Sequence, residues 1–372
     1  MQRIFHTPEG VRDIYGRECR QKHELKRRIR SVFQKYGYEE IKTPTFEYFE
    51  VFSQEVGTVP SRELYKFFDR DGNTLVLRPD FTPSVSRACA SYFSPDKEPV
   101  TLFYTGQTFV NSSSYQGRLK EITQMGVERI GDDSPEADAE LLAMTVEALL
   151  SSGLREFQVS VGQVDYFKSL LKEAGLEKKA EEHLRALISE KNYFGVEELV
   201  EEQKLSPGLA AVFQELPHLF GSVEVLKKAR DLTDNQSAVQ AVERLERIYE
   251  LMKVYGYEKY ISFDFGMVSR IQYYTGIIFQ AYTYGTGEPL VKGGRYNELL
   301  KHFGTPAASV GFVIMADSLL TALSRQKIEI LSHEDPYVLT YTDETLEEAV
   351  VKAQRLRKEG RFVSLRKKKE GL

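Results

Sequence analysis

Residues 102–131 read LFYTGQTFVNSSSYQGRLKEITQMGVERIG, and this stretch decides the fold. A hydrophobic run at 102–110 enters a polar loop at 111–117, and a second run then returns through Gln124 and Glu128. Two such runs on either side of a polar loop with a glycine predict a long antiparallel hairpin. Because side chains alternate between the faces of a strand, alternate residues of the returning run share one face of a sheet.

The size and composition are those of an ordinary globular protein. The chain has 372 residues, of which 41% are hydrophobic and 28% charged, enough for one large domain and a small one. Its net charge of −5 argues against a large nucleic-acid interface, because phosphate contacts usually require a basic surface. No apolar run is long enough to span a membrane, and the start lacks the apolar region of a secretory signal. We therefore expect a cytoplasmic location.

The sequence gives no sign of a metal or a cofactor. Two cysteines, Cys19 and Cys89, cannot form a disulfide framework or a four-cysteine zinc site. The 6 histidines show no metal-ligand spacing, and neither a Walker A nor a GxSxG sequence occurs. We expect no bound metal and no cofactor.

Periodicity predicts a helix at the start of the chain and a sheet after it. In the predicted helix at 18–36, Leu25, Ile29 and Phe33 recur at a spacing of four. A strand at 38–44 should follow. The other elements predicted before residue 300 are a strand, turn and helix start at 74–87, a helix at 136–150, and strands at 157–163, 260–269 and 276–284.

Two regions depart from the sheet pattern. From about 164 to 257 short helical stretches dominate, which predicts a helical insertion. At 335–372 a strand, a helix and a strand form a piece too small to be a complete domain. We therefore expect one domain at 1–325, including the insertion, and a separate α/β region at 335–372. The basic run at 366–370 is either a solvated tail or a nucleic-acid patch, and the tail is favoured.

The hairpin resembles motif 2 of the class II aminoacyl-tRNA synthetases, in particular the histidyl branch. Three further segments resemble that family in order and spacing: LRPDFT at 77–82, MVSRIQYYTGIIFQ at 267–280, and GFVIMADSLL at 311–320 after VKGGRYNELL. The resemblance covers roughly residues 5–325. It implies an α+β fold, in which an antiparallel sheet is flanked by helices and carries a helical insertion. The C-terminal piece resembles the beginning of an anticodon-binding domain.

The matching positions imply a pocket for histidine. The residues implied are Asp80, Thr82, Arg118, Gln124, Glu128, Tyr273, Tyr274, Gly293 and Gly294. Imidazole is specified by one acceptor and one donor at opposite ends, and Glu128 with a tyrosine hydroxyl can supply them. Alternatively, Glu128 is a structural carboxylate and the tyrosines fill a core. The joint occurrence of these residues in family order favours the pocket.

The nucleotide side of the family's site does not match. Val110, Ser269 and Ser318 stand where the family has arginines, and Ser112 stands where it has a glutamate. Arg270 is one step away, which in an extended segment turns a side chain to the opposite face. Adenylate formation needs fixed cations against the triphosphate, each worth about 1.5 to 3 kcal/mol. The resemblance therefore implies no catalytic residues.

A synthetase fold with a histidine side and no nucleotide side resembles the regulatory subunits of short-form ATP phosphoribosyltransferase, which act in the first step of histidine biosynthesis. That resemblance implies a hetero-octamer with a catalytic subunit, and feedback by L-histidine. The segment at 40–50 resembles class II motif 1, which implies a homodimer. No membrane or nucleic acid is expected as a partner. Two alternatives remain open, a divergent histidyl-tRNA synthetase and an RNA-binding or sensor module.

Overall fold

The computed structural model describes residues 6–53, 59–112, 119–268, 274–330 and 335–368. The chain divides into two compact units. One comprises Met1–Ile14 and Leu25–Ile330, and the other comprises Tyr15–Glu24 and Leu331–Leu372. The predicted domain bounds, at 325 and 335, stay a prediction. No helix in the described ranges is long and apolar enough to cross a membrane.

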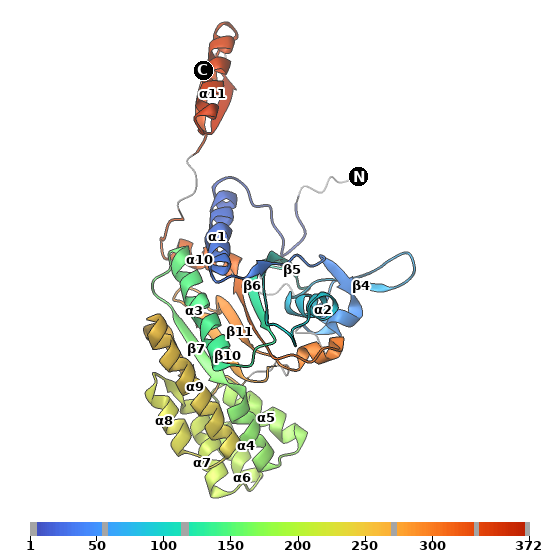
Figure 1. Cartoon of the computed structure of the whole chain (residues 1–372), viewed down its shortest axis with the longest axis vertical. Coiled ribbons are helices and arrows are strands. Elements are labelled where there is room, and N and C mark those ends of the chain that lie inside the picture. The colour runs from blue at the N-terminus through green and yellow to red at the C-terminus, as the bar shows by residue number, and fades with distance from the viewer. Residues whose placement is uncertain (1–5, 54–58, 113–118, 269–273, 331–334, 369–372) are drawn as a thin grey trace. The chain divides into compact units, whose positions relative to one another are not determined.

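The larger unit is built on a nine-stranded sheet (Figure 1). In spatial order its strands are β1 (Glu39–Glu40), β5 (Val100–Phe109), β6 (Glu121–Ile130), β12 (Ser309–Met315), β11 (Val291–Arg295), β10 (Ile277–Tyr282), β7 (Gln158–Gln163), β9 (Ile261–Asp264) and β8 (Phe220–Gly221). Neighbouring strands run antiparallel except in the pairs β1–β5 and β7–β9. The predicted α+β fold with a largely antiparallel sheet is confirmed.

The predicted hairpin is β5 and β6, which pair over their whole length. Its register places Leu102 opposite Glu128 and Gly106 opposite Gln124. Opposite residues share a face of the sheet, so alternation places these four side-chain positions on one face. The odd-numbered residues of β6 point to the other face.

The two faces of this sheet are covered differently. The face of Phe103, Val127 and Phe312 forms the main hydrophobic core with three helices. These helices are α1 (Gly16–Lys35), α3 (Pro135–Ser152) and α10 (Ala316–Arg325). On the other face Phe81 and Leu102 pack together beside α2 (Thr82–Tyr92). The rest of that face is where the synthetase-like motifs converge.

The helical stretch between β7 and β9 folds as a bundle, seen at the lower end of the view in Figure 1. Its helices are α4 (Val164–Ala174), α5 (Lys178–Ser189), α6 (Tyr193–Glu202), α7 (Pro207–Glu215), α8 (Glu224–Asp231) and α9 (Gln236–Tyr255). In α9 the side chain of Asn235 caps the first turn, and Gly256 ends the helix with a φ of 74°. α9 packs along α3 and α4, which anchors the bundle to the sheet.

The strand predicted at 38–44 is much shorter than expected. Only β1 pairs with the sheet, and Ile41 makes one further bond to Phe103. Beyond it, the Arg78 guanidinium donates to the carbonyls of Thr43 and Pro44 at 2.9 and 3.0 Å. A side chain from elsewhere thus takes the place of a neighbouring strand.

A small sheet follows this segment, and it places α2. Its strands, in spatial order, are β2 (Phe46–Tyr48), β4 (Thr74–Leu77) and β3 (Lys66–Phe68). The sequence prediction of a strand, a turn and a helix start at 74–87 is confirmed by β4 and α2. Pro83 lies in the first turn of α2, where its missing N–H costs nothing.

The smaller unit contains a strand, a helix and a strand, in the predicted order. β13 (Tyr337–Tyr341) and β14 (Val363–Lys367) pair in parallel, joined by α11 (Leu346–Lys358). Leu339, Ala353 and Leu356 form its small core. This core is independent of the main one.

Candidate functional site

Two glycines lie on the face of the sheet opposite the main core, where they leave space above the strands. Gly294 on β11 lies directly opposite Gly311 on β12, which in turn lies opposite Glu128 on β6. A Cβ at Gly311 would lie 1.8 Å from Glu128 Oε2, and one at Gly294 would lie 2.6 Å from the ring of Tyr274. The missing side chains therefore leave room for the Glu128 carboxylate and the Tyr274 ring. The two groups lie above neighbouring strands.

Three hydroxyl groups bind the buried carboxylate of Glu128. Its side chain is almost completely buried, and Thr82 donates to Oε1 at 2.8 Å. Tyr104 donates to the same oxygen at 3.4 Å, and Tyr296 donates to Oε2. Burial is the main cause that raises the pKa of Glu128 to about 8; the hydroxyls oppose this, and the nearby Asp80 adds to it. The site thus holds a carboxylate poised to gain or lose a proton near neutral pH.

The side-chain oxygen of Gln124 is a hydrogen-bond acceptor for which the described residues supply no donor. The residue is 8% exposed, and in the described part of the chain its Oε1 is buried without a hydrogen-bond partner. An unsatisfied buried acceptor costs about 1 to 3 kcal/mol, so such atoms are usually paired by a ligand or water. Asp80, at the start of α2, accepts from the amides of Phe81 and Thr82 at 2.7 and 3.4 Å. Asp80 also raises the pKa of Glu128, so these two carboxylates lie near each other, and Gln124 lies on the same face of β6 as Glu128.

The remaining predicted site residues are placed differently. Tyr274 is 7% exposed and packs with Val164 and Ile278 on the Glu128 side of the sheet. A Cβ at Gly293 would meet Phe279 and Phe312, so Gly293 faces the main core instead. Arg118 and Tyr273 lie outside the described residues.

Two tyrosines of this site were missed in the sequence. Tyr104 lies opposite Gly126 on the hairpin, so the alternation that groups Gln124 with Glu128 also includes it. Tyr296 directly follows the end of β11, so the alternation of side chains along a strand does not identify it. Its hydroxyl reaches Glu128 only because β11 and β6 flank β12.

A cavity lies beside positions at which the chain departs from the synthetase motifs. It has a volume of about 420 Å³, and its lining includes Val110, Ser112 and Ser318. The three substituted positions therefore meet in space; Ser269 lies outside the described residues. Two arginines, Arg12 and Arg325, also line this cavity, from other positions in the sequence. The residues that replace the motif arginines are an aliphatic side chain and hydroxyls, which supply no fixed charge for a triphosphate.

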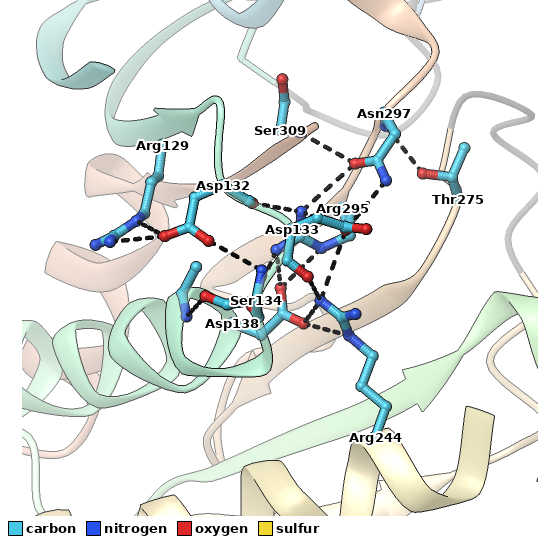
Figure 2. A network of polar contacts seen from close by, with 11 residues as sticks. Arg129, Asp132, Asp133, Ser134, Asp138, Arg244, Thr275, Arg295, Asn297 and Ser309 are labelled. Atoms are coloured by element: carbon cyan, nitrogen blue, oxygen red, sulfur yellow. Dashed lines mark hydrogen bonds and ion pairs between the residues drawn. The ribbon is translucent and has the colours of Figure 1, made fainter. Parts of the chain in front are cut away.

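A buried ionic network lies beside the Tyr274 segment (Figure 2). Its centre is Asp138, whose side chain is fully buried between two guanidinium groups. Arg295 donates to Oδ1 from Nε and Nη2 at 3.0 and 2.6 Å, and Arg244 donates to Oδ2 from Nε at 2.7 Å. Burial raises the pKa of Asp138, while the two arginines oppose that shift. Removing either arginine would leave a buried charge partly unpaired.

The network reaches the site through Asn297 and Thr275. The main-chain N–H of Asn297 donates to Thr275 Oγ1 at 2.9 Å, and the main-chain N–H of Thr275 donates to the carbonyl of Arg295 at 2.8 Å. The residue after Tyr274 is thus tied to the end of β11. Among the described residues, no group of three His, Cys, Asp or Glu side chains could hold a metal ion.

Comparison with known proteins identifies the family. A model of histidyl-tRNA synthetase matches residues 10–319. The ATP phosphoribosyltransferase regulatory subunit of Acetivibrio thermocellus is 39% identical over 361 residues, 97% of this chain and 86% of that protein. The regulatory subunit of Clostridium acetobutylicum is 37% identical, over 96% of this chain and 88% of that protein.

Solved structures agree with this. A crystal structure from Bacillus halodurans C, described as an ATP phosphoribosyltransferase regulatory subunit/histidyl-tRNA synthetase, matches with a TM-score of 0.89 and 33% identity. The match covers 99% of this chain and 94% of that one. Histidyl-tRNA synthetase from Nostoc sp. PCC 7120 matches with a TM-score of 0.83 over 100% of this chain and 88% of that one. At 21% identity it supports the fold alone. The chain belongs to the ATP phosphoribosyltransferase regulatory subunits, a family with the histidyl-tRNA synthetase fold.

Proposed function

We propose that the chain binds L-histidine beside Glu128 and transmits its presence to a catalytic ATP phosphoribosyltransferase subunit, without activating the amino acid. The observation that carries this proposal is the unpartnered, buried Oε1 of Gln124 on the same face of the sheet as Glu128, whose carboxylate lies near that of Asp80. Histidine offers an ammonium group and a ring N–H, all donors. A site of acceptors complements them.

The remaining residues of the proposed pocket follow from this arrangement. Glu128 accepts from one ring nitrogen, and Tyr274, whose ring lies above Gly294, offers its hydroxyl to the opposite ring nitrogen. Gln124 and Asp80 hold the ammonium group. Thr82 and Tyr296 keep the Glu128 carboxylate oriented by donating to its two oxygens.

The proposal excludes tRNA charging. Val110, Ser112 and Ser318 line the neighbouring cavity where fixed cations are needed to stabilise charge at the α-phosphorus. Histidine-dependent exchange of pyrophosphate into ATP should therefore stay at background. Exchange above background would mean that Arg12 or Arg325 has taken over the function of the motif arginines.

The regulatory role rests on assembly. The names of the relatives refer to a regulatory subunit of ATP phosphoribosyltransferase, so the proposed partner is a catalytic subunit of that enzyme. We propose a hetero-octamer that contains homodimers of this chain. Co-expression with a short-form catalytic subunit, followed by co-purification and an activity assay with and without this chain, tests the assembly.

Calorimetry with the purified chain tests the ligand. L-histidine should bind, and above pH 8, where the carboxylate is ionised, Glu128→Ala should weaken binding by about 1.5 to 3 kcal/mol, the range of a hydrogen bond to a charged group. Glu197→Ala, on the exposed side of α6, is the matched control. If Glu128→Ala binds histidine as tightly as the control does, Glu128 does not belong to the pocket.

A further inference from the structure

The first helix of the insertion holds the main chain around Tyr274. Lys168, on α4, donates from Nζ to the carbonyl oxygen of Tyr274 at 2.8 Å. At the start of the same helix, the amide of Val164 donates to the carbonyl of Gly276 at 2.9 Å. α4 therefore contacts the main chain on both sides of Thr275.

Lys168 is partly buried, which is unusual for a lysine side chain. Its side chain is half-buried, and burial lowers its pKa, an effect that the nearby Asp165 opposes. Within the described ranges its ammonium makes no ion pair, and the Tyr274 carbonyl is its hydrogen-bond partner. A lysine whose only task was solubility would extend into water, because burying its charge is unfavourable. The hydrogen bond to the Tyr274 carbonyl offsets part of that cost.

The same segment is also bonded to the buried network (Figure 2). Thr275 bonds to Arg295 and Asn297, and Arg295 is fixed by Asp138. Asp138 is also bound by Arg244, which comes from α9, the last helix of the insertion. The first and last helices of the insertion thus reach the segment after Tyr274 by separate routes. The direct route is Lys168.

We propose that Lys168 is a positioning residue through which the helical insertion fixes the main chain of Tyr274 and so sets the affinity of the Glu128 pocket. The affinity part of this proposal rests on the proposed histidine function; the positioning part does not. Without the Lys168 ammonium, the Tyr274 carbonyl loses this hydrogen bond and the segment loses one of its anchors. The ring above Gly294 then samples positions that no longer face a ligand.

The test compares Lys168→Met with the rescue variant Lys168→Arg and the control Lys172→Met, which removes an exposed lysine from the same helix. Hydrogen exchange of the ligand-free full chain is measured by mass spectrometry at Thr275–Gly276. Exchange there should be about tenfold faster in Lys168→Met and near wild type in the other two. Unchanged exchange in Lys168→Met overturns the proposal. Lys168→Gln replaces Lys168→Met if that variant does not fold.

Calorimetry provides the second measurement. Lys168→Met should weaken histidine binding about 3- to 10-fold, as the loss of one hydrogen bond would. If Lys168 acts through Tyr274, its effect should largely disappear in a Tyr274→Phe background. Losses that simply add overturn the positioning role. If the wild type binds no histidine but Lys168→Met still exchanges faster, the proposed ligand is wrong and the positioning of Tyr274 stands.

Discussion

Glu128 combines complete burial with partners that are hydroxyls in the described part of the chain. Its pKa is raised from 4.5 to about 8 in the folded protein, chiefly by burial. Between these two values the folded state keeps a proton that the unfolded state releases. The free energy of unfolding therefore has its full value below pH 4.5 and falls as the pH rises toward 8.

This linkage predicts a different pH profile for Glu128→Gln. The amide cannot ionise, so the variant should lose a slope of up to about 1.4 kcal/mol per pH unit in that window. Urea unfolding of both proteins at pH 5, 6.5 and 8 measures the slope. Parallel profiles for wild type and variant would show that Glu128 is already ionised at neutral pH.

Gly311 provides a steric test of the same site. A Cβ at this position would lie 1.8 Å from Glu128 Oε2 and 2.7 Å from the carbonyl of Val127. Gly311→Ala should therefore displace the carboxylate and abolish histidine binding, and also lower stability, because the main chain cannot easily move. Gly287→Ala is the control, since nothing lies within 4 Å of its Cβ. Calorimetry that detected wild-type affinity in Gly311→Ala would place the ligand elsewhere.

At the scale of elements, a buried ion pair joins α9 to α3 and adds to the apolar packing of these two helices. Arg244 binds the fully buried Asp138, whereas Arg247, on the same helix, pairs with Glu136 where both side chains are about half exposed. Arg244→Met should cost about 3 to 5 kcal/mol of unfolding free energy, because Asp138 keeps only Arg295. Arg247→Met should cost less than about 1 kcal/mol. Equal losses in urea unfolding would contradict the network's role in anchoring α9.

Much of the element pattern could be predicted from local sequence. The hairpin follows from two hydrophobic runs around a polar loop, and Leu25, Ile29 and Phe33 are buried on one side of α1 as their spacing predicts. The strand at 38–44 could not be predicted correctly. Its hydrogen bonds depend on the Arg78 guanidinium, which comes from a segment more than thirty residues away.

In the candidate site, too, local patterns predict some residues, whereas others depend on contacts between distant segments. Alternation on β6 places Gln124 and Glu128 on one face, and it also accounts for Tyr104 on the paired strand. Tyr296 and the partners of Asp138 could not be found this way, because their contacts depend on the order of strands in the sheet. No sequence pattern predicts the contact of Lys168, because its partner is a main-chain carbonyl, which every residue has.

For the whole molecule, the small sheet suggests how the predicted homodimer forms. Phe46, Tyr48 and Phe67 lie on one of its faces by register, and they are 51%, 55% and 37% exposed. Exposed apolar groups that gather on one face often mark an interface, and a dimer would pair this face with its own copy. Phe46→Glu combined with Tyr48→Glu should therefore shift the chain toward a monomer. Phe68→Glu, an exposed residue of the opposite face, should leave the mass measured by light scattering unchanged. A wild-type monomer at micromolar concentration would contradict the dimer itself.

The final prediction concerns feedback in the complex with the catalytic subunit. Histidine can shift that assembly between states only if it binds one state more tightly than the other. By linkage, the catalytic subunit and its substrates must change histidine affinity by the same factor, which is typically about 5- to 150-fold. In a complex carrying Glu128→Ala, inhibition by histidine should therefore weaken while uninhibited activity persists, because Glu128 contributes to ligand binding and not to the chemistry. A complex carrying Glu197→Ala should be inhibited like wild type. If Glu128→Ala leaves inhibition unchanged while calorimetry shows that it abolishes binding to this chain, feedback acts through a site on the catalytic subunit.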